Sequence, residues 1–173
     1  TVFAAYGWKI VRLKYGARQR AAFAEPGGEN LRAWIDDCPN ALFSALTFQG
    51  GGAWRRRLLD DIGDQGPTTA LIERRSDADL AALMTDLGGH CLASLAAAFD
   101  SIDSDQPVLF LAYTVKGWGT PFAGHKDNHA GLMTGAQMDG FRAAMGVVPG
   151  REWDRFAATA GVDGLADRLA HVP

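Results

Sequence analysis

The sequence predicts an α/β layer fold, in which the strands of a partial parallel sheet alternate with helices. Two runs of bulky and β-branched residues predict strands, at residues 8–14 (WKIVRLK) and 107–115 (PVLFLAYTV). The second run is almost continuously apolar, which is typical of a central parallel strand covered on both faces. A long helical stretch separates the two runs. The order strand, helices, strand is typical of α/β folds.

Helical spacing of apolar residues predicts the elements between the strands. Residues 27–47 indicate two short helices or one bent helix, interrupted at Pro39. Residues 50–52 (GGG) predict a loop, and residues 53–62 predict a helix with Trp54 near its inner face. The glycine run matches neither the P-loop nor the dinucleotide fingerprint, so a phosphate cradle is not expected there.

Capping signals predict where the other helices begin and end. Ser76 has an acid three residues later, so it should cap a helix that stops at Gly88. The first residues look like the last turns of a helix closed by Gly7, and we therefore expect further chain upstream. One further helix is predicted to start near Ala136, and three others are predicted at residues 91–99, 151–160 and 162–170.

Charge and cysteine content exclude several classes of protein. The 173 residues carry a net charge of -3, so there is no global electrostatic case for binding nucleic acid or an anionic membrane. The basic run at residues 55–57 precedes Asp60 and Asp61, which predicts the solvated, self-compensated side of a helix. Cys38 and Cys91 lack metal-ligand spacing and predict reduced core thiols. Without a membrane span or signal segment, we expect a cytoplasmic location.

The segment after the second strand has the composition of a functional loop. Residues 116–135 are rich in glycine and begin at the carboxyl end of a predicted parallel strand, where ligands of open α/β sheets usually bind. Lys116 can neutralise a phosphate or carboxylate, and His125 and His129 can exchange protons near neutral pH. We therefore predict an active-site loop. The alternative is a polar surface connection.

The histidines also allow two other interpretations. The spacing of His125 and His129 suits zinc only on a helix, and Gly124 and Gly131 argue against a helix. His90 stands at a junction between two predicted helices, where capping or packing is the simplest interpretation.

Several short motifs resemble one enzyme family in the same order. Residues 113–119 (YTVKGWG) resemble the "TxKGxG" strand-end motif of the homodimeric pyruvate dehydrogenase decarboxylating component, and residues 125–129 (HKDNH) resemble the histidine loop that follows it. Further similar stretches are residues 5–8, 14–18, 52–56, 87–90 and 138–142. A more distant resemblance, to transketolase, covers Gly117, Gly119, Pro121 and residues 129–131.

The resemblance implies a three-layer thiamine-diphosphate-binding fold. Residues 1–147 would form the later half of the diphosphate-side domain, and residues 148–173 a helical segment leading to the next domain. In such enzymes the cofactor serves as electron sink, and the protein supplies orientation and proton transfer. Magnesium and the diphosphate are held by a "GDG…N" segment that this chain lacks, so no metal ligand is assigned here.

The resemblance also implies roles for individual residues. Lys116, His125 and His129 are the expected catalytic residues, and which histidine is the loop acid or base stays open. Lys116, His129 and His90 are the expected cofactor contacts, with packing as the alternative for His90.

For the parent protein, the resemblance implies oxidative decarboxylation of a 2-oxo acid, with pyruvate as the expected substrate. The acyl group would pass to a lipoyl-bearing dihydrolipoyl acyltransferase, and the parent would be a homodimer. The alternatives are transketolase-type ketol transfer between sugar phosphates and a non-catalytic stand-alone module. The isolated chain is predicted to be inactive and to bind thiamine diphosphate poorly.

Overall fold

The computed structural model describes residues 2–63 and 66–154, and it divides the chain into two compact units. The first unit is Thr1–Leu132 and the second is Met133–Pro173. The boundary expected between residues 147 and 148 is a domain boundary that the family resemblance implies, and it is a different division from that between the two compact units.

A small parallel sheet is present in the first unit, as predicted. β1 (Lys9–Leu13) pairs with β2 (Val108–Ala112) in parallel, and Lys9 is opposite Val108 while Leu13 is opposite Ala112. The mixture of helices with a parallel sheet agrees with the α/β class. The order of the strands in space, β1 next to β2, follows from the long helical excursion between them.

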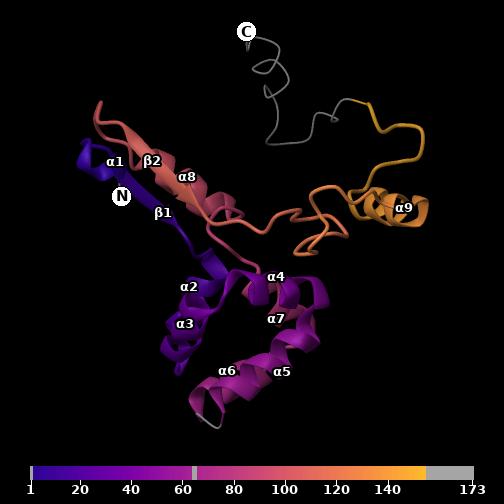
Figure 1. Ribbon diagram of the computed structural model, residues 1–173, viewed down its shortest axis with the longest axis horizontal. Coiled ribbons are helices and arrows are strands. Elements are labelled where there is room, and N and C mark those ends of the chain that lie inside the picture. Colours follow the sequence, from indigo (N-terminus) through magenta and orange to yellow (C-terminus); the bar gives the residue numbers. More distant parts are fainter. Residues whose placement is uncertain (1, 64–65, 155–173) are drawn as a thin grey trace. The chain divides into compact units, whose positions relative to one another are not determined.

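The expectation that the second strand is covered on both faces is wrong for the described residues. Val108 to Leu111 are only half-buried, and Ala112 is exposed. α8 (Leu92–Asp100) lies beside the strands (Figure 1), and the ring of Phe99 packs on that of Phe110 at 4.8 Å. The continuous apolar run thus has more hydrophobic surface than the described residues cover.

The segment before β1 agrees with its prediction. α1 (Val2–Ala5) ends at a turn in which Gly7 has a φ of 80°, a conformation that favours glycine. The ring of Phe3 packs edge-on against Trp8 at 5.3 Å.

Six of the helices that separate the two strands in the sequence form the hydrophobic core of the first unit. Their bounds are α2 (Ala17–Phe23), α3 (Gly28–Asp37), α4 (Asn40–Gln49), α5 (Gly51–Ile62), α6 (Pro67–Glu73) and α7 (Asp77–Met84). The largest fully buried side chain is Trp54 on α5, and Leu31, Leu58, Leu71, Leu80 and Met84 are buried with it. The helices α2 and α6 were not predicted.

Helix boundaries follow the predicted signals at some positions. The break at Pro39 separates α3 from α4, as expected, because proline disfavours a helical residue before it. Ser76 caps α7, and its hydroxyl accepts a hydrogen bond from the backbone N–H of Asp79 at 3.1 Å. α7 nevertheless ends at Met84 rather than at Gly88.

The predicted glycine loop at residues 50–52 is a correction. α5 already begins at Gly51, and only Gly50, with a φ of 85°, lies outside the helix. A Cβ atom on Gly51 would overlap the backbone of Asp77 at the start of α7. Close approach of two helices, rather than loop flexibility, therefore explains the glycine at this position.

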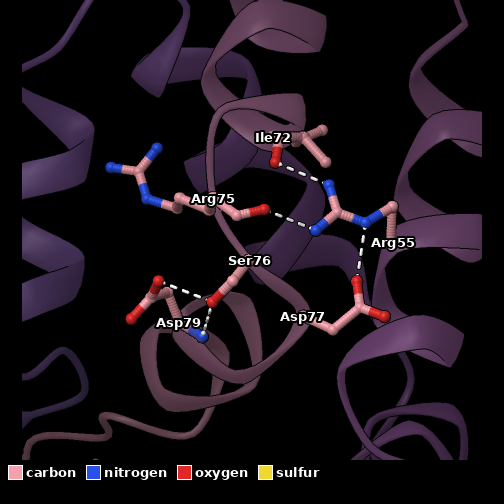
Figure 2. A network of polar contacts seen from close by, with 6 residues as sticks. All are labelled: Arg55, Ile72, Arg75, Ser76, Asp77 and Asp79. Carbon is pink, nitrogen blue, oxygen red and sulfur yellow. Dashed lines mark hydrogen bonds and ion pairs between the residues drawn. The ribbon is translucent and has the colours of Figure 1, made fainter.

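Arg55 on α5 forms a second contact between α5 and the start of α7. Its guanidinium donates to the carbonyl oxygens of Ile72, at 3.0 Å, and Arg75, and it pairs with the Asp77 carboxylate at 2.7 Å (Figure 2). The prediction of a fully solvated basic run is therefore wrong for Arg55. It is right for Arg57, which pairs one turn further along α5 with Asp61 at 2.7 Å.

The neighbouring glycines of α5 give a matched test of this packing. Gly51→Ala is expected to lower the free energy of unfolding by about 1–3 kcal/mol, because its methyl group meets the Asp77 backbone. Gly52→Ala is expected to leave stability unchanged or to raise it by up to about 1 kcal/mol, because its methyl group meets only the ends of two side chains, Asp77 at 3.2 Å and Arg56 at 3.6 Å, and alanine favours the helix. Urea unfolding followed by circular dichroism measures both. Equal effects would contradict the close approach of α5 and α7.

The second unit contains α9 (Gly135–Ala144) in its described part. Thr134 caps this helix together with Gln137, and the two form a capping box at the place where helical patterning was predicted to resume. Residues 151–154 form a turn and not the start of the predicted helix. The rest of the predicted helices at 151–160 and 162–170 lies outside the described residues.

None of the helices in the described part of the chain combines the length and the apolar character needed to cross a membrane.

Candidate functional site

Residues 87–90, which we call the clip, join the carboxyl ends of the two strands. The backbone N–H of Gly88 donates to the Lys14 carbonyl just after β1, at 3.0 Å. The N–H of Gly89 donates to the Tyr113 carbonyl just after β2, at 2.9 Å. The clip thus ties together the edge of the sheet at which ligands of parallel α/β proteins bind.

Both glycines of the clip are required by close approach to the backbone. A Cβ atom on Gly88 would overlap the backbone of Leu13, and one on Gly89 would lie 2.6 Å from the Tyr113 carbonyl oxygen. Gly88 was predicted as a helix stop. Its place in the clip shows a different reason for the glycine, which is the close approach of the Leu13 backbone. The preceding Leu87 is already outside the helix: it is buried and forms an antiparallel bridge with Tyr15.

His90 ends the clip and contacts the start of the predicted active-site loop. Its Nε2 atom accepts a hydrogen bond from the backbone N–H of Val115 at 2.7 Å. Its ring stacks on Trp118, with centroids 4.5 Å apart and planes 13° from parallel. Burial lowers the pKa of His90, and the Asp86 carboxylate opposes that shift without cancelling it. The ring is therefore neutral at pH 7, with its proton on Nδ1.

A cavity of about 910 Å³ opens at the same edge of the sheet. Strand ends supply one wall, and the connection between α3 and α4 supplies the other. Its lining includes Lys14, Asp36, Cys38, Asn40, Ser44, Leu87, Tyr113, Thr114, Val115 and Lys116. Of the predicted site residues, Lys116 lines this cavity, whereas His90, His125 and His129 are not among its lining residues.

A charged cluster that the sequence analysis missed lies on the wall next to β1. The Lys14 ammonium group and the Tyr15 hydroxyl both contact the Asp36 carboxylate at the end of α3. Burial alone would raise the pKa of Asp36, but the bonds from Lys14 and Tyr15 outweigh it and lower the pKa. Burial likewise disfavours the charge on Lys14, and its hydrogen bond to Asp36 outweighs that effect and raises the pKa. Both groups stay charged, and each compensates the other.

One signal in the sequence could have identified Lys14. It directly follows the first strand, just as Lys116 lies beyond the second, and both strands end at the same edge. Asp36 had no such signal, because its contact with Lys14 joins residues on different elements.

The predicted loop consists of successive turns folded back on its own start. Gly117, Gly119 and Gly124 have positive φ angles, which favour glycine. The Lys116 carbonyl accepts hydrogen bonds from the Gly124 N–H at 3.3 Å and from the Asn128 side-chain amide at 2.8 Å. The backbone of Lys116 is thereby fixed from the loop side.

The two loop histidines have different surroundings. The His125 ring packs on Phe48 of α4 at 4.5 Å, and its Nδ1 atom accepts from the Asp127 N–H at 3.1 Å. His129 is exposed, and its side chain makes no hydrogen bond or ion pair with the described residues. His129 is thus the more exposed of the two loop histidines.

Neither cysteine lies in the core, contrary to the prediction. Both are free thiols and half-buried. Burial raises the pKa of Cys38, with Arg57 opposing the shift. Hydrogen bonding to Ser94 lowers the pKa of Cys91, which precedes the first residue of α8.

Within residues 2–63 and 66–154, no group of three or more His, Cys, Asp or Glu side chains is arranged to hold a metal ion.

Comparison of the chain with protein-family models gave no match, and comparison with curated proteins gave none.

Proposed function

We propose that this chain is part of a thiamine-diphosphate-dependent enzyme that oxidatively decarboxylates a 2-oxo acid, with pyruvate as the substrate and a lipoyl-bearing acyltransferase as the acyl acceptor. The observation that carries the proposal is the position of Lys116. It lines a cavity at the carboxyl end of a parallel strand and matches the lysine of the "TxKGxG" motif that residues 113–119 resemble. The three-layer cofactor-binding fold is proposed with it.

The charges around the cavity support a role for Lys116 toward an anion. Two lysines line the cavity, and Lys14 is already paired with Asp36. Lys116 makes no ion pair with another described residue, so its charge is available to a carboxylate or to negative charge that develops during a reaction.

The described residues do not by themselves fit a diphosphate with its magnesium ion. They offer one uncompensated lysine in the cavity and no cluster of acidic side chains that could hold a metal. In the proposal, the metal and diphosphate ligands therefore come from other parts of the parent homodimer.

The roles proposed for this chain are orientation, charge stabilisation and proton transfer. Lys116 stabilises negative charge from the strand end. His129 exchanges a proton with the reacting group, because it is exposed on the loop and its ring is not engaged by described neighbours. His125 is instead a loop anchor, since its ring and its Nδ1 atom are both in use.

The test is pyruvate-dependent reduction of an artificial electron acceptor by the parent-length protein, with thiamine diphosphate and magnesium. Lys116→Ala and His129→Ala are each expected to lower kcat by about 100-fold or more. Lys9→Ala is the matched control and should retain activity, because Lys9 begins β1 at the opposite end of the strand and pairs with Asp103 at 3.6 Å.

Other outcomes separate the alternatives. Turnover of a ketose phosphate with an aldose acceptor, without activity on pyruvate, would replace the decarboxylase by the ketol-transfer enzyme. No turnover of either substrate by the parent would leave the stand-alone module. Tight binding of thiamine diphosphate to the isolated chain in calorimetry would contradict the inference that other parts of the parent supply its ligands.

A further inference from the structure

We propose that His90 is the positioning residue of the proposed site: its Nε2 atom and its ring face together hold the turn that carries Lys116 at the end of β2. The contact itself does not depend on the proposed function, but its consequence for catalysis rests on that function.

The hydrogen bond satisfies a donor that the sheet does not. The pairing of β2 ends at Ala112, and Val115 lies three residues further on with an exposed fraction of only 7%. A buried N–H without a partner is costly, and His90 supplies the acceptor at 2.7 Å. The direction in which the chain leaves the sheet therefore depends on this ring.

The stacked ring adds a second contact on the same turn. Trp118 is 55% exposed, and its backbone N–H donates to the Val115 carbonyl at 3.1 Å. The imidazole of His90 thus contacts residues on both sides of Lys116. A large, half-exposed indole keeps its place because it packs face to face on a ring that is itself bonded to the backbone.

The clip fixes the position of His90 in turn. Gly88 and Gly89 bond to both strand ends, so the ring is attached to the sheet and not to a mobile connection. On the other side, Gly124 and Asn128 bond to the Lys116 carbonyl. Loss of the His90 contact would move the backbone of Lys116 without removing its charge.

The contact requires the neutral ring with its proton on Nδ1, because a protonated Nε2 would turn its N–H toward the N–H of Val115. The charged groups nearest in the chain are Asp86, which favours the protonated ring, and Lys116, beyond the bonded Val115. Burial keeps the pKa of His90 below its ordinary value of about 6.5. The unfolded chain then binds more protons, so the stabilisation is complete above about pH 6.5 and is lost as the pH falls below it.

The test uses the 173-residue chain with His90→Gln and His90→Leu. Glutamine retains an acceptor oxygen near the position of Nε2, and leucine retains only volume. Amide hydrogen exchange by NMR gives the protection factor of the Val115 N–H. At pH 7.5, leucine should lower this factor about tenfold or more, and glutamine should largely preserve it. Between about pH 7.5 and 5.5, the factor should fall in the wild type and stay constant in His90→Gln.

On the 173-residue chain, either of two results would overturn the proposal. One is equal protection of Val115 in the wild type and His90→Leu. The other is a ¹⁵N spectrum of the wild type at pH 7.5 with the His90 proton on Nε2. The second measurement needs no variant, so it decides the matter even where a substituted chain fails to fold.

Activity of the parent-length protein separates positioning from general stability. If His90 acts through Lys116, His90→Leu should lower kcat in the wild type and have little further effect in Lys116→Ala. Additive losses would leave His90 with a structural role only. A parent without activity on pyruvate would refute the proposed function but would leave the Val115 measurement intact.

Discussion

Trp54→Ala is expected to lower the free energy of unfolding by about 3–5 kcal/mol, as is typical when a large aromatic side chain is removed from a core. Trp54 is 0% exposed at the centre of the helical cluster. Its ring meets Phe43 of α4 at 5.0 Å and Trp34 of α3 at 6.0 Å, both edge-on. Removing it opens a cavity between three helices at once.

A loss of this size is a large part of the 5–15 kcal/mol that typically stabilises a domain, so the urea midpoint followed by circular dichroism should fall far below that of the wild type. Trp54→Phe should cost less than half as much. It keeps most of the volume, and it removes an indole N–H that has no hydrogen-bond partner among the described residues.

Trp153→Ala is the matched control, because Trp153 is 96% exposed and its removal should change stability by less than about 0.5 kcal/mol. A small effect at both positions would contradict the placement of Trp54 in the core. The contrast rests on burial, since both substitutions remove the same side chain.

Gly88→Ala is expected to have the second large effect, at or above the upper end of the usual 1–3 kcal/mol for overpacking. The added methyl group would meet the backbone of Leu13, which is held in the sheet by its pairing with β2 and cannot yield as a side chain would. The clip must then move away from the strand end, and the bond from the Gly88 N–H to Lys14 should break.

Two measurements separate this local effect from a general loss of stability. Thermal unfolding gives the overall change, and hydrogen exchange at the Gly88 and Gly89 amides reports on the clip itself. Gly135→Ala, where an added Cβ meets nothing within 4 Å, should be neutral. Wild-type protection of both clip amides in Gly88→Ala would contradict the close approach. If the proposed function is right, Gly88→Ala should also lower the activity of the parent-length protein together with clip protection.

Local signals predicted the elements that are determined over a few residues. The apolar run at residues 107–115, the break at Pro39 and the cap at Ser76 each depend on backbone preferences of the residues themselves. The helices α2 and α6 were missed because each has only seven residues, too few for intrinsic propensity to stabilise. Tertiary packing stabilises them instead, as the buried Thr68 and Leu71 of α6 show.

The candidate site divides in the same way. Lys116, His125 and His129 were predicted because they lie in a glycine-rich segment that directly follows a strand. Both signals belong to one continuous stretch of the sequence. Nothing in that segment indicated that His125 packs on Phe48 while His129 stays exposed.

By itself, the sequence determined the class of the fold, the two parallel strands and the loop that follows the second of them. The tertiary structure alone decided the functions of Gly51, Gly88 and His90, and the pairing of Lys14 with Asp36. The physical reason is the distance along the chain. A glycine is required where another backbone approaches it, and a histidine is neutral where a distant N–H needs its lone pair. Such partners lie 22 or more residues away and exist only after the helices have packed.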